Sequence, residues 1–272
     1  MIKSSVHTHS VYCDGRNTLS EMAQAAYNAG LECIGFSSHS YVAIDGFGMK
    51  PEKMPMYLAE AKELKDIYAG KLDVMTGIEF DSFSDPELVS TGFDYTIGSS
   101  HAVRDLLGEY CVVDGRVQKL IDGVVNGFGG DFLLMCEHYF QQHARFVCSF
   151  KPDIVGHFDL VTKHNKGNRF FDETCNRYRT AAMDALDAVL ATECIIEVNV
   201  GAINRGFTPH PYPSDFLLKR VLEKKGRVII TADAHGVDQL VAKTDFAEEL
   251  LKSYGFNSVM ELSCNGFYER KL

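Results

Sequence analysis

Several features that would place a protein in a special class are missing from this sequence. No apolar run approaches the roughly 18 residues of a membrane-spanning helix, and there is no fixed-period repeat, linker rich in Pro or Ser, or low-complexity tract. The segment Met1–His7 lacks the basic and then apolar stretches of a signal peptide. We therefore expect a cytoplasmic protein that does not enter a membrane.

Paired cysteines and excess positive charge are also missing. The chain has 8 cysteines but no C-x-x-C pair, and its 272 residues make it too long for a small disulfide scaffold. We expect reduced thiols and no zinc ribbon. The formal net charge of −10 argues against broad binding to nucleic acid, so no nucleic-acid partner is expected. The sequence does not indicate an oligomeric state.

The composition is that of an ordinary globular protein, with 46% apolar and 24% charged residues. Short segments rich in Val, Ile and Phe alternate with helical patterns, which predicts parallel strands joined by crossover helices. Seven strands in a chain of 272 residues favour a closed barrel over a small open sheet. The predicted strands are Ile2–Val6, Cys33–Phe36, Asp73–Thr76, Tyr95–Ile97, Ile154–Val155, Cys194–Val198 and Arg227–Ile230.

Helical periodicity predicts five helices between and after these strands. Thr18 and Glu21 have the spacing of a capping box at the start of the first helix. Residues 113–150 depart from the alternation, because they contain two helices separated by Gly127–Gly130. We interpret them as an insertion between strands 4 and 5, within a single domain covering residues 1–272. The other predicted helices are Leu19–Ala29, Pro55–Ala69, Asp172–Leu190, Ser214–Lys225 and Val241–Tyr254.

Histidines and acids follow nearly every predicted strand. In a barrel of parallel strands, all carboxyl ends open on one face, where active sites form. Residues i and i+2 of a strand point the same way, so His7 with His9, and Asp233 with His235, can face one site together. Imidazole and carboxylate are ligands that borderline divalent metals prefer. A single H-x-H motif would be weak support for a metal site, but histidines or acids recur at the carboxyl end of one predicted strand after another. The pattern therefore predicts a metal site.

Other residues have plainer interpretations. We place His138 and His143 on a surface-facing helix. We place His164 and His210 in loops near the barrel face, as candidate substrate contacts. Cys13 lies near the metal-binding segment, but no C-x5-R phosphate loop surrounds it, so covalent chemistry is disfavoured.

The order and spacing of these motifs resemble those of the PHP (polymerase and histidinol phosphatase) superfamily, from His7 to His235. Within that superfamily the chain most resembles the histidinol-phosphate phosphatases, in its length, its insertion and the run Glu197–Gly206 followed by Tyr-Pro-Ser. One departure is Asn204, where a leucine is expected before Arg205. The motifs that carry the resemblance are H-x-H, S-S-H, G-I-E, G-S-S-H, G-H-F-D and D-A-H.

The resemblance implies a distorted TIM-like (β/α)7 barrel with three divalent metal ions, for which Zn, Mn and Fe are equally suitable. It groups the ligands by metal: His7, His9, Glu79 and Asp233 for the first, Glu79, His101 and His157 for the second, and Asp14, His39 and His235 for the third.

The implied activity is hydrolysis of L-histidinol phosphate, a step of histidine biosynthesis, by a water or hydroxide shared between two metals. Arg205 and Asp233 would be catalytic, with Arg205 clamping the phosphate, and His164 and His210 would contact the substrate. The substrate is a small phosphorylated molecule that also carries an ammonium group. Asp159, Glu109 and Asp81 are candidates to bind that group, and the sequence does not choose among them.

Three alternatives remain open at this point. The first is a related phosphoesterase acting on a sugar phosphate, a nucleotide 3′-phosphate or a short oligonucleotide. The second is a non-catalytic PHP module, which is disfavoured because all nine implied ligands are present. The third is a metal-dependent amidohydrolase, which is disfavoured because no lysine stands at a predicted strand end.

Overall fold

A curled sheet of nine strands organises the molecule, in the order β1-β2-β3-β4-β7-β8-β9-β10-β11. The computed structural model describes residues 2–44, 46–89 and 92–272. From β1 to β10 neighbouring strands run parallel, and β11 is antiparallel to β10. The strands are β1 (Ser4–Ser5), β2 (Cys33–Phe36), β3 (Asp73–Asp81), β4 (Tyr95–Ser99), β7 (Ile154–Val155), β8 (Ile195–Asn199), β9 (Val228–Thr231), β10 (Ser258–Ser263) and β11 (Gly266–Lys271).

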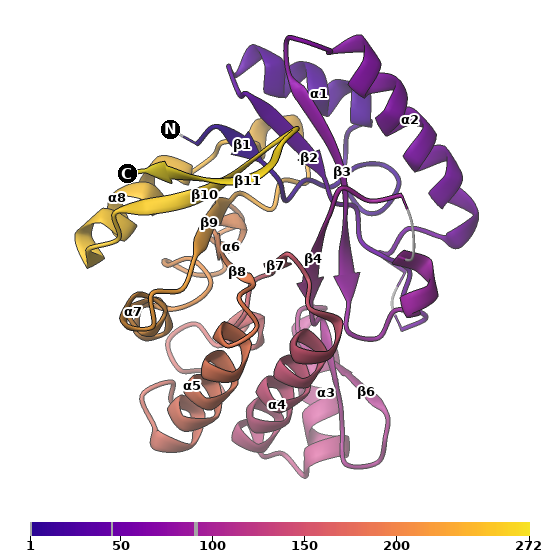
Figure 1. Cartoon of the computed structure of the whole chain (residues 1–272). Coiled ribbons are helices and arrows are strands. Elements are labelled where there is room, and N and C mark those ends of the chain that lie inside the picture. Colours follow the sequence, from indigo (N-terminus) through magenta and orange to yellow (C-terminus); the bar gives the residue numbers. More distant parts are fainter. Residues whose placement is uncertain (1, 45, 90–91) are drawn as a thin grey trace.

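Helices lie on the outer side of this curled sheet (Figure 1). The capping box of α1 is present, because Thr18 Oγ1 accepts from Glu21 N at 3.2 Å and Glu21 Oε2 accepts from Thr18 N at 2.9 Å. The helices are α1 (Leu19–Asn28), α2 (Met54–Ile67), α3 (Val117–Phe128), α4 (Phe132–Phe150), α5 (Asn176–Leu190), α6 (Gly201–Asn204), α7 (Asp215–Glu223) and α8 (Thr244–Tyr254). No helix in the described ranges is both long enough and apolar enough to cross a bilayer.

The sheet closes on itself in two different ways. At the carboxyl ends Thr8 bridges Ala234, and the main-chain nitrogen of His9 donates to the carbonyl oxygen of Ala234 at 2.8 Å. At the amino ends β10 stands beside β1, where Glu261 Oε2 accepts from Ser4 N at 2.8 Å. The predicted TIM-like α/β barrel is therefore confirmed: all seven predicted strands are present and parallel, β10 adds an eighth parallel strand, and the main-chain closure lies at the carboxyl ends.

Two apolar cores flank the sheet. The outer core fills the space between the strands and the helices, and the inner core lies inside the curl around Tyr95. The Tyr95 hydroxyl donates to the carbonyl oxygen of Phe36 at 3.2 Å, and a Cβ atom at Gly35 or Gly77 would overlap its ring. The two glycines therefore leave room for an aromatic ring that fills the barrel below the carboxyl ends of the strands.

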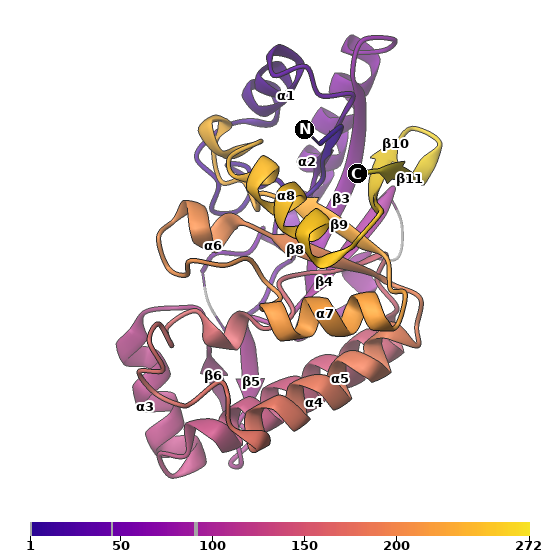
Figure 2. The same cartoon turned by 90° about the vertical axis from the view of Figure 1, so that its left-hand side faces the viewer.

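The insertion contains the two predicted helices, α3 and α4. Gly129 ends α3 with a left-handed φ of 62°, and the Asp131 side chain caps α4 by accepting from Leu134 N at 3.0 Å. The structure adds a two-stranded hairpin that the sequence analysis missed, formed by β5 (Ala102–Arg104) and β6 (Tyr110–Val112). Figure 2 shows this hairpin and α3 projecting together from one end of the molecule.

The antiparallel hairpin of β10 and β11 was also missed. Ser263 pairs with Gly266 across a two-residue loop, Cys264 and Asn265. The Asn-Gly step at this turn is a recognisable hairpin signal, and it follows a segment in which buried side chains predominate.

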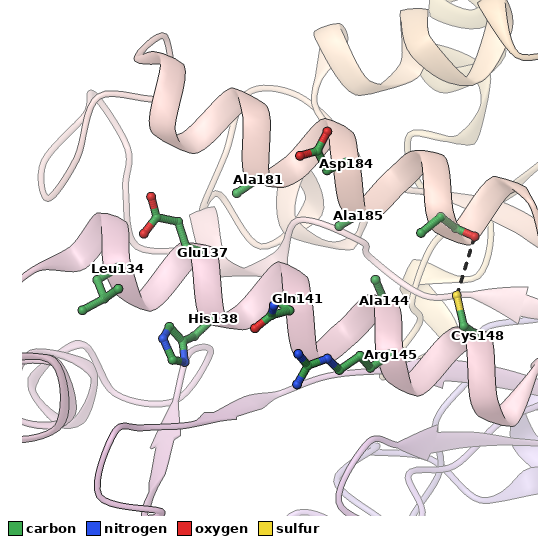
Figure 3. Close-up of a pocket in the computed structure, with 11 residues that line it drawn as sticks. Leu134, Glu137, His138, Gln141, Ala144, Arg145, Cys148, Ala181, Asp184 and Ala185 are labelled. Carbon is green, nitrogen blue, oxygen red and sulfur yellow. Dashed lines mark hydrogen bonds between the residues drawn. The ribbon is translucent and has the colours of Figure 1, made fainter.

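Helices α4 and α5 pack side by side and leave a groove of about 540 Å³ between them (Figure 3). Small side chains such as Ala144, Ala181 and Ala185 line it, and Cys148 Sγ donates to the carbonyl oxygen of Ala188 at 3.6 Å. This groove lies on the outer helical layer. A separate cavity opens at the carboxyl ends of the strands.

Candidate metal centre

Imidazole and carboxylate side chains from six parallel strands converge at the carboxyl end of the sheet. Each follows or ends its strand, as the alternating sequence pattern predicts, and the sheet curl turns them toward one another. The nine residues brought together are the predicted ligands His7, His9, Asp14, His39, Glu79, His101, His157, Asp233 and His235.

The carboxylate of Glu79 lies at the centre, fully buried. Its Oε2 atom is 2.7 Å from His39 Nδ1, 3.2 Å from His7 Nε2 and 3.6 Å from His9 Nε2. His7 and His9 point to the same side because they are two residues apart in extended chain. One carboxylate oxygen thus faces three imidazoles.

The second oxygen of Glu79 faces two more imidazoles. Oε1 lies 2.9 Å from His157 Nε2 and 3.4 Å from His101 Nε2. Glu79 therefore stands between two groups of nitrogen atoms, one on each oxygen, which is the geometry of a carboxylate that can bridge two cations.

Asp233 joins the same centre from β9. Its Oδ1 atom is 3.1 Å from His9 Nε2 and 3.7 Å from His7 Nε2, while Oδ2 is 2.9 Å from a terminal nitrogen of Arg205. The backbone of Asp233 has a left-handed φ of 50°, which is uncommon outside glycine. At this turn the carboxylate faces His7 and His9, which follow β1.

Asp14 forms a third group at the open side. Its Oδ2 atom lies 3.4 Å from His235 Nε2 and its Oδ1 atom 3.7 Å from His39 Nε2. His9 is also within reach of this group. The predicted set of Asp14, His39 and His235 therefore comes together. His39 also directs its Nδ1 atom toward Glu79, so its ring lies between the Asp14 and Glu79 carboxylates.

The donor set fits divalent cations. Four atoms at the centre are buried yet have no hydrogen-bond partner within the described ranges: Nε2 of His7, Nε2 of His9, Nδ1 of His39 and Oε2 of Glu79. Buried polar atoms are normally satisfied, and nitrogen and carboxylate oxygen atoms aimed at a common point are suitable ligands for zinc, manganese or iron. These clusters form a site for several divalent ions.

Hydrogen bonds behind the imidazoles fix which nitrogen faces the centre. A carboxylate or carbonyl oxygen only accepts, so the imidazole nitrogen beside it carries the proton. Asp81 Oδ2 lies 2.9 Å from His101 Nδ1, Glu197 Oε1 contacts His7 Nδ1, and the carbonyl oxygen of Asp233 is 3.0 Å from His235 Nδ1. In His7, His101 and His235 the Nε2 atom is therefore directed to the centre.

Sequence reasoning missed the orienting roles of Asp81 and Glu197. The two-residue periodicity of a strand is the signal that could have found them. Asp81 lies two residues after Glu79, and Glu197 lies two residues before Asn199, so each shares a strand face with another polar residue at a strand end. Glu197 also accepts from the main-chain nitrogen of His157 at 2.6 Å. Such partners commonly hold metal-binding histidines in place.

Burial and close charges shift the pKa values of the centre in opposite directions. Burial raises the pKa of Glu79, but His39, His7 and His101 outweigh it and hold that pKa well below its usual range. Burial, with the neighbouring His235 and His39, lowers the pKa of His9 to about 3. Glu79 is therefore a carboxylate and His9 a neutral imidazole, which are the protonation states that a metal ligand needs.

A cavity of about 360 Å³ opens above the centre, a size suited to a small ligand. Arg205 lines it, as predicted for a phosphate-binding cation, and so does Lys163, which the sequence analysis did not single out. Phe47 and Phe207 form apolar parts of the wall. The cavity thus combines the candidate metal ligands with two cations and two aromatic rings.

Some predicted residues lie elsewhere. The prediction of a surface position for His143 was wrong, because this residue is fully buried with Nδ1 2.8 Å from Ser100 Oγ. It lies on the buried face of α4 with Tyr139, Phe140 and Val147, whereas the partly exposed His138 lies on the other side of the helix. His164 contacts the carbonyl oxygen of Gly115 at 2.8 Å, and neither His164 nor His210 is among the residues that line the cavity.

Comparison with known proteins decides the family. A model described as the PHP domain matches residues 5–201. The chain belongs to the PHP domain family.

Relatives of this PHP-family chain carry related names. It is 24% identical over 256 residues to the histidinol-phosphatase of Bacillus subtilis, covering 86% of this chain and 94% of the relative. It is 28% identical over 240 residues to a probable histidinol-phosphatase of Deinococcus radiodurans, covering 84% and 85%. A crystal structure of histidinol phosphate phosphatase from Lactococcus lactis, complexed with zinc, L-histidinol and phosphate, has a TM-score of 0.69 at 22% identity, covering 98% of each chain.

The structural likeness establishes that the PHP chain shares its α/β barrel-like fold along nearly its whole length. The family match ends at residue 201, so Arg205, Asp233 and His235 lie beyond it. Their place in the centre comes from the geometry of β9 and the turn after β8, where Asp233 contacts both His9 and Arg205.

Proposed function

We propose that this chain is a metal-dependent phosphatase that hydrolyses L-histidinol phosphate to L-histidinol and phosphate. The observation that carries the proposal is the convergence of nine ligand-type side chains, from six strands, below a cavity also lined by Arg205 and Lys163. The family and the names of its relatives support the substrate. The nine residues are the proposed ligands of three divalent ions.

When bound at these residues, divalent ions would supply positive charge for a phosphate dianion and lower the pKa of a water molecule that attacks phosphorus. The chain's own residues prepare the site. Asp81 and Glu197 hold His101 and His7 so that each directs Nε2 inward. The arrangement needs no nucleophilic side chain, and burial raises the pKa of the nearby Cys13 thiol to about 11, which keeps it protonated.

Arg205 binds the phosphate in this proposal. Its guanidinium is held at the cavity wall by the Asp233 carboxylate at 2.9 Å and by the Asp233 carbonyl oxygen at 3.2 Å. A guanidinium has five N–H donors, so donors remain for phosphate oxygens. Asp233 links this cation to the histidines through its other oxygen, 3.1 Å from His9 Nε2. Asp233 and Arg205 therefore act as one unit.

The proposal includes further expectations for the whole protein. We infer one PHP domain over residues 1–272, with residues 113–150 as a helical insertion. All 8 cysteines are free, which supports the cytoplasm as the working compartment. A centre loaded with divalent ions would favour small phosphate esters, whereas the net charge of −10 disfavours nucleic acid as a partner.

A substrate panel tests the assignment. The metal-loaded protein is assayed for phosphate release from L-histidinol phosphate, sugar phosphates, a nucleoside 3′-phosphate and a short oligonucleotide. We expect the highest kcat/KM for L-histidinol phosphate. A higher kcat/KM for another ester would assign the chain to a different phosphoesterase activity, and no phosphate release from any ester would remove the phosphatase proposal.

A further inference from the structure

The acids predicted to bind a substrate ammonium group are all engaged or remote. Asp81 accepts from the main-chain nitrogen of His101 at 3.1 Å and contacts its imidazole. Asp159 is fully buried and accepts from Ser214 N at 2.9 Å. Glu109 is exposed in the turn of the β5–β6 hairpin. The residues that line the cavity include none of these three acids.

Asp114 lines the same cavity from the insertion, two residues after the end of β6. The other acids of the lining, Asp14 and Asp233, are proposed metal ligands. The Asp114 side chain is 23% exposed, so it is partly desolvated but still reachable. No hydrogen bond to its carboxylate oxygens comes from residues 2–44, 46–89 or 92–272. The carboxylate is therefore available to a ligand in the cavity.

Lys163 holds the main chain at this point. Its Nζ atom donates to the carbonyl oxygen of Asp114 at 2.7 Å and lies 5.0 Å from the centre of the Phe207 ring. The same Nζ is 3.6 Å from Asp114 Oδ2, which is an ion-pair contact beyond hydrogen-bond distance. Lys163 thus positions the Asp114 loop against the cavity and leaves the carboxylate oxygens able to accept hydrogen bonds.

The lining of the cavity therefore carries groups of both charges. Arg205 and the proposed metal ions would attract a phosphate, and the Asp114 carboxylate, 3.6 Å from Lys163 Nζ, lines the same cavity. A molecule with a phosphate at one end and an ammonium group a few bonds away matches both.

We propose that Asp114 is the specificity-determining residue that binds the ammonium group of an aminoalkyl phosphate, with Lys163 as its positioning residue. The inference rests on the proposed phosphatase function for its substrate class, and it assigns the recognition to one side chain of the insertion. It places the recognising carboxylate at the start of the insertion, between the end of β6 and the beginning of α3.

The test compares two matched esters on wild type and D114N. The first ester is L-histidinol phosphate, and the second is the same molecule with hydrogen in place of the amino group. We expect D114N to lower kcat/KM for the amine-bearing ester about 10- to 100-fold and to change kcat/KM for the amine-free ester less than about threefold. An equal loss on both esters, or no loss on either, would overturn the proposal.

A matched control separates this effect from a general loss of negative charge. E109Q removes one charge from the neighbouring, exposed turn of the β5–β6 hairpin and should leave kcat/KM for both esters unchanged. K163M should raise KM for the amine-bearing ester more than for the amine-free one, because it frees the Asp114 loop. If E109Q reproduces the D114N discrimination, Asp114 has no specific role.

A binding measurement distinguishes this inference from the proposed function. Calorimetry of L-histidinol with metal-loaded wild type and D114N needs no turnover. Weaker binding to D114N supports the role of Asp114 even if wild type releases no phosphate, in which case only the phosphatase proposal fails. Equal binding to both proteins, or no binding to wild type, overturns the ammonium site whatever the activity assay shows.

Discussion

The carboxylate of Asp81 holds His101 at two points, with Oδ2 2.9 Å from the imidazole Nδ1 and 3.1 Å from the main-chain nitrogen. Asp81 and Glu79 are two residues apart on β3, so one strand contributes both the central carboxylate and the group that orients an imidazole beside it. We therefore expect the strength of metal binding to depend on a residue that is not itself among the proposed ligands.

Replacing Asp81 by Asn should weaken metal binding while leaving the proposed ligands in place. An amide cannot match the charge of the carboxylate, so the His101 tautomer is held less firmly. We expect a 10- to 100-fold loss of metal affinity, measured by titration with a competing chelator. D85N, on the exposed turn after the same strand, is the matched control. Unchanged affinity in D81N would show that Asp81 does not orient His101.

Removing His101 should have a larger effect. H101A deletes one of the two imidazoles that face Glu79 Oε1, so we expect fewer bound ions per chain by elemental analysis and a loss of at least 100-fold in kcat. H138A, on the partly exposed side of α4, should keep both properties. Full activity with a full metal content in H101A would remove His101 from the ligand set.

Arg205 should be required for binding the phosphate. R205A removes the guanidinium and leaves one oxygen of Asp233 without its partner, so kcat/KM should fall by about 100-fold. R205K should recover only part of this loss, because an ammonium cannot hold two oxygens side by side. Arg145, exposed on α4, provides the control variant R145A. Near-normal kcat/KM in R205A would exclude the clamp.

Removing the metal ions with a chelator should abolish the phosphatase activity reversibly. Dialysis against a strong chelator removes ions from the clusters around Glu79, and activity should fall to the background of uncatalysed hydrolysis. Adding zinc, manganese or iron back should restore it, and circular dichroism should report an intact fold throughout. Full activity after complete removal of metal, verified by elemental analysis, would contradict the proposed chemistry.

His143 should make the free energy of unfolding depend on pH. Burial, with His157 and His101 nearby, lowers its pKa from 6.5 to about 3 in the folded state. Between these values the unfolded chain binds the extra proton, so stability is lost as the pH falls below 6.5. We expect proton binding to His143 in the unfolded chain to lower the free energy of unfolding by about 2 kcal/mol at pH 5 relative to pH 8. H143Q should not show this decrease.

The measurement is urea unfolding of metal-free wild type and H143Q from pH 5 to 8. Both proteins contain the same other titrating groups, so the difference between their unfolding free energies isolates His143. The stability advantage of wild type should shrink toward pH 5. A difference independent of pH would mean that His143 does not titrate on unfolding.

Much of the centre was predictable because strand ends in a parallel barrel share one face. Strand positions and the two-residue periodicity were enough to predict that His7, His9 and Glu79 meet. In the structure the Nε2 atoms of both histidines lie within 3.6 Å of Glu79 Oε2. The pairing of ligands was harder. His39 contacts Glu79 through one nitrogen and Asp14 through the other, and which nitrogen faces which acid depends on rotamers set by packing.

Longer-range features were not predictable from local pattern. Asp114 is an ordinary loop acid in sequence, and it reaches the cavity because Lys163, 49 positions later, binds its carbonyl oxygen. The strands β5 and β6 have only three residues each, too short for a periodic signal. His143 was misplaced although the helical pattern contained the answer: it lies on one continuous buried face of α4 with Met135, Tyr139 and Val147, and the sequence analysis did not apply that pattern to it.

The bridge between Thr8 and Ala234 has a consequence for how the protein is made. His7 and His9 are synthesised long before Ala234, the main-chain partner of the segment that carries them. Contacts between such distant parts of a chain form slowly. The nascent protein can therefore complete this centre only after Ala234 and His235 have emerged from the ribosome, and a product terminated before them lacks it.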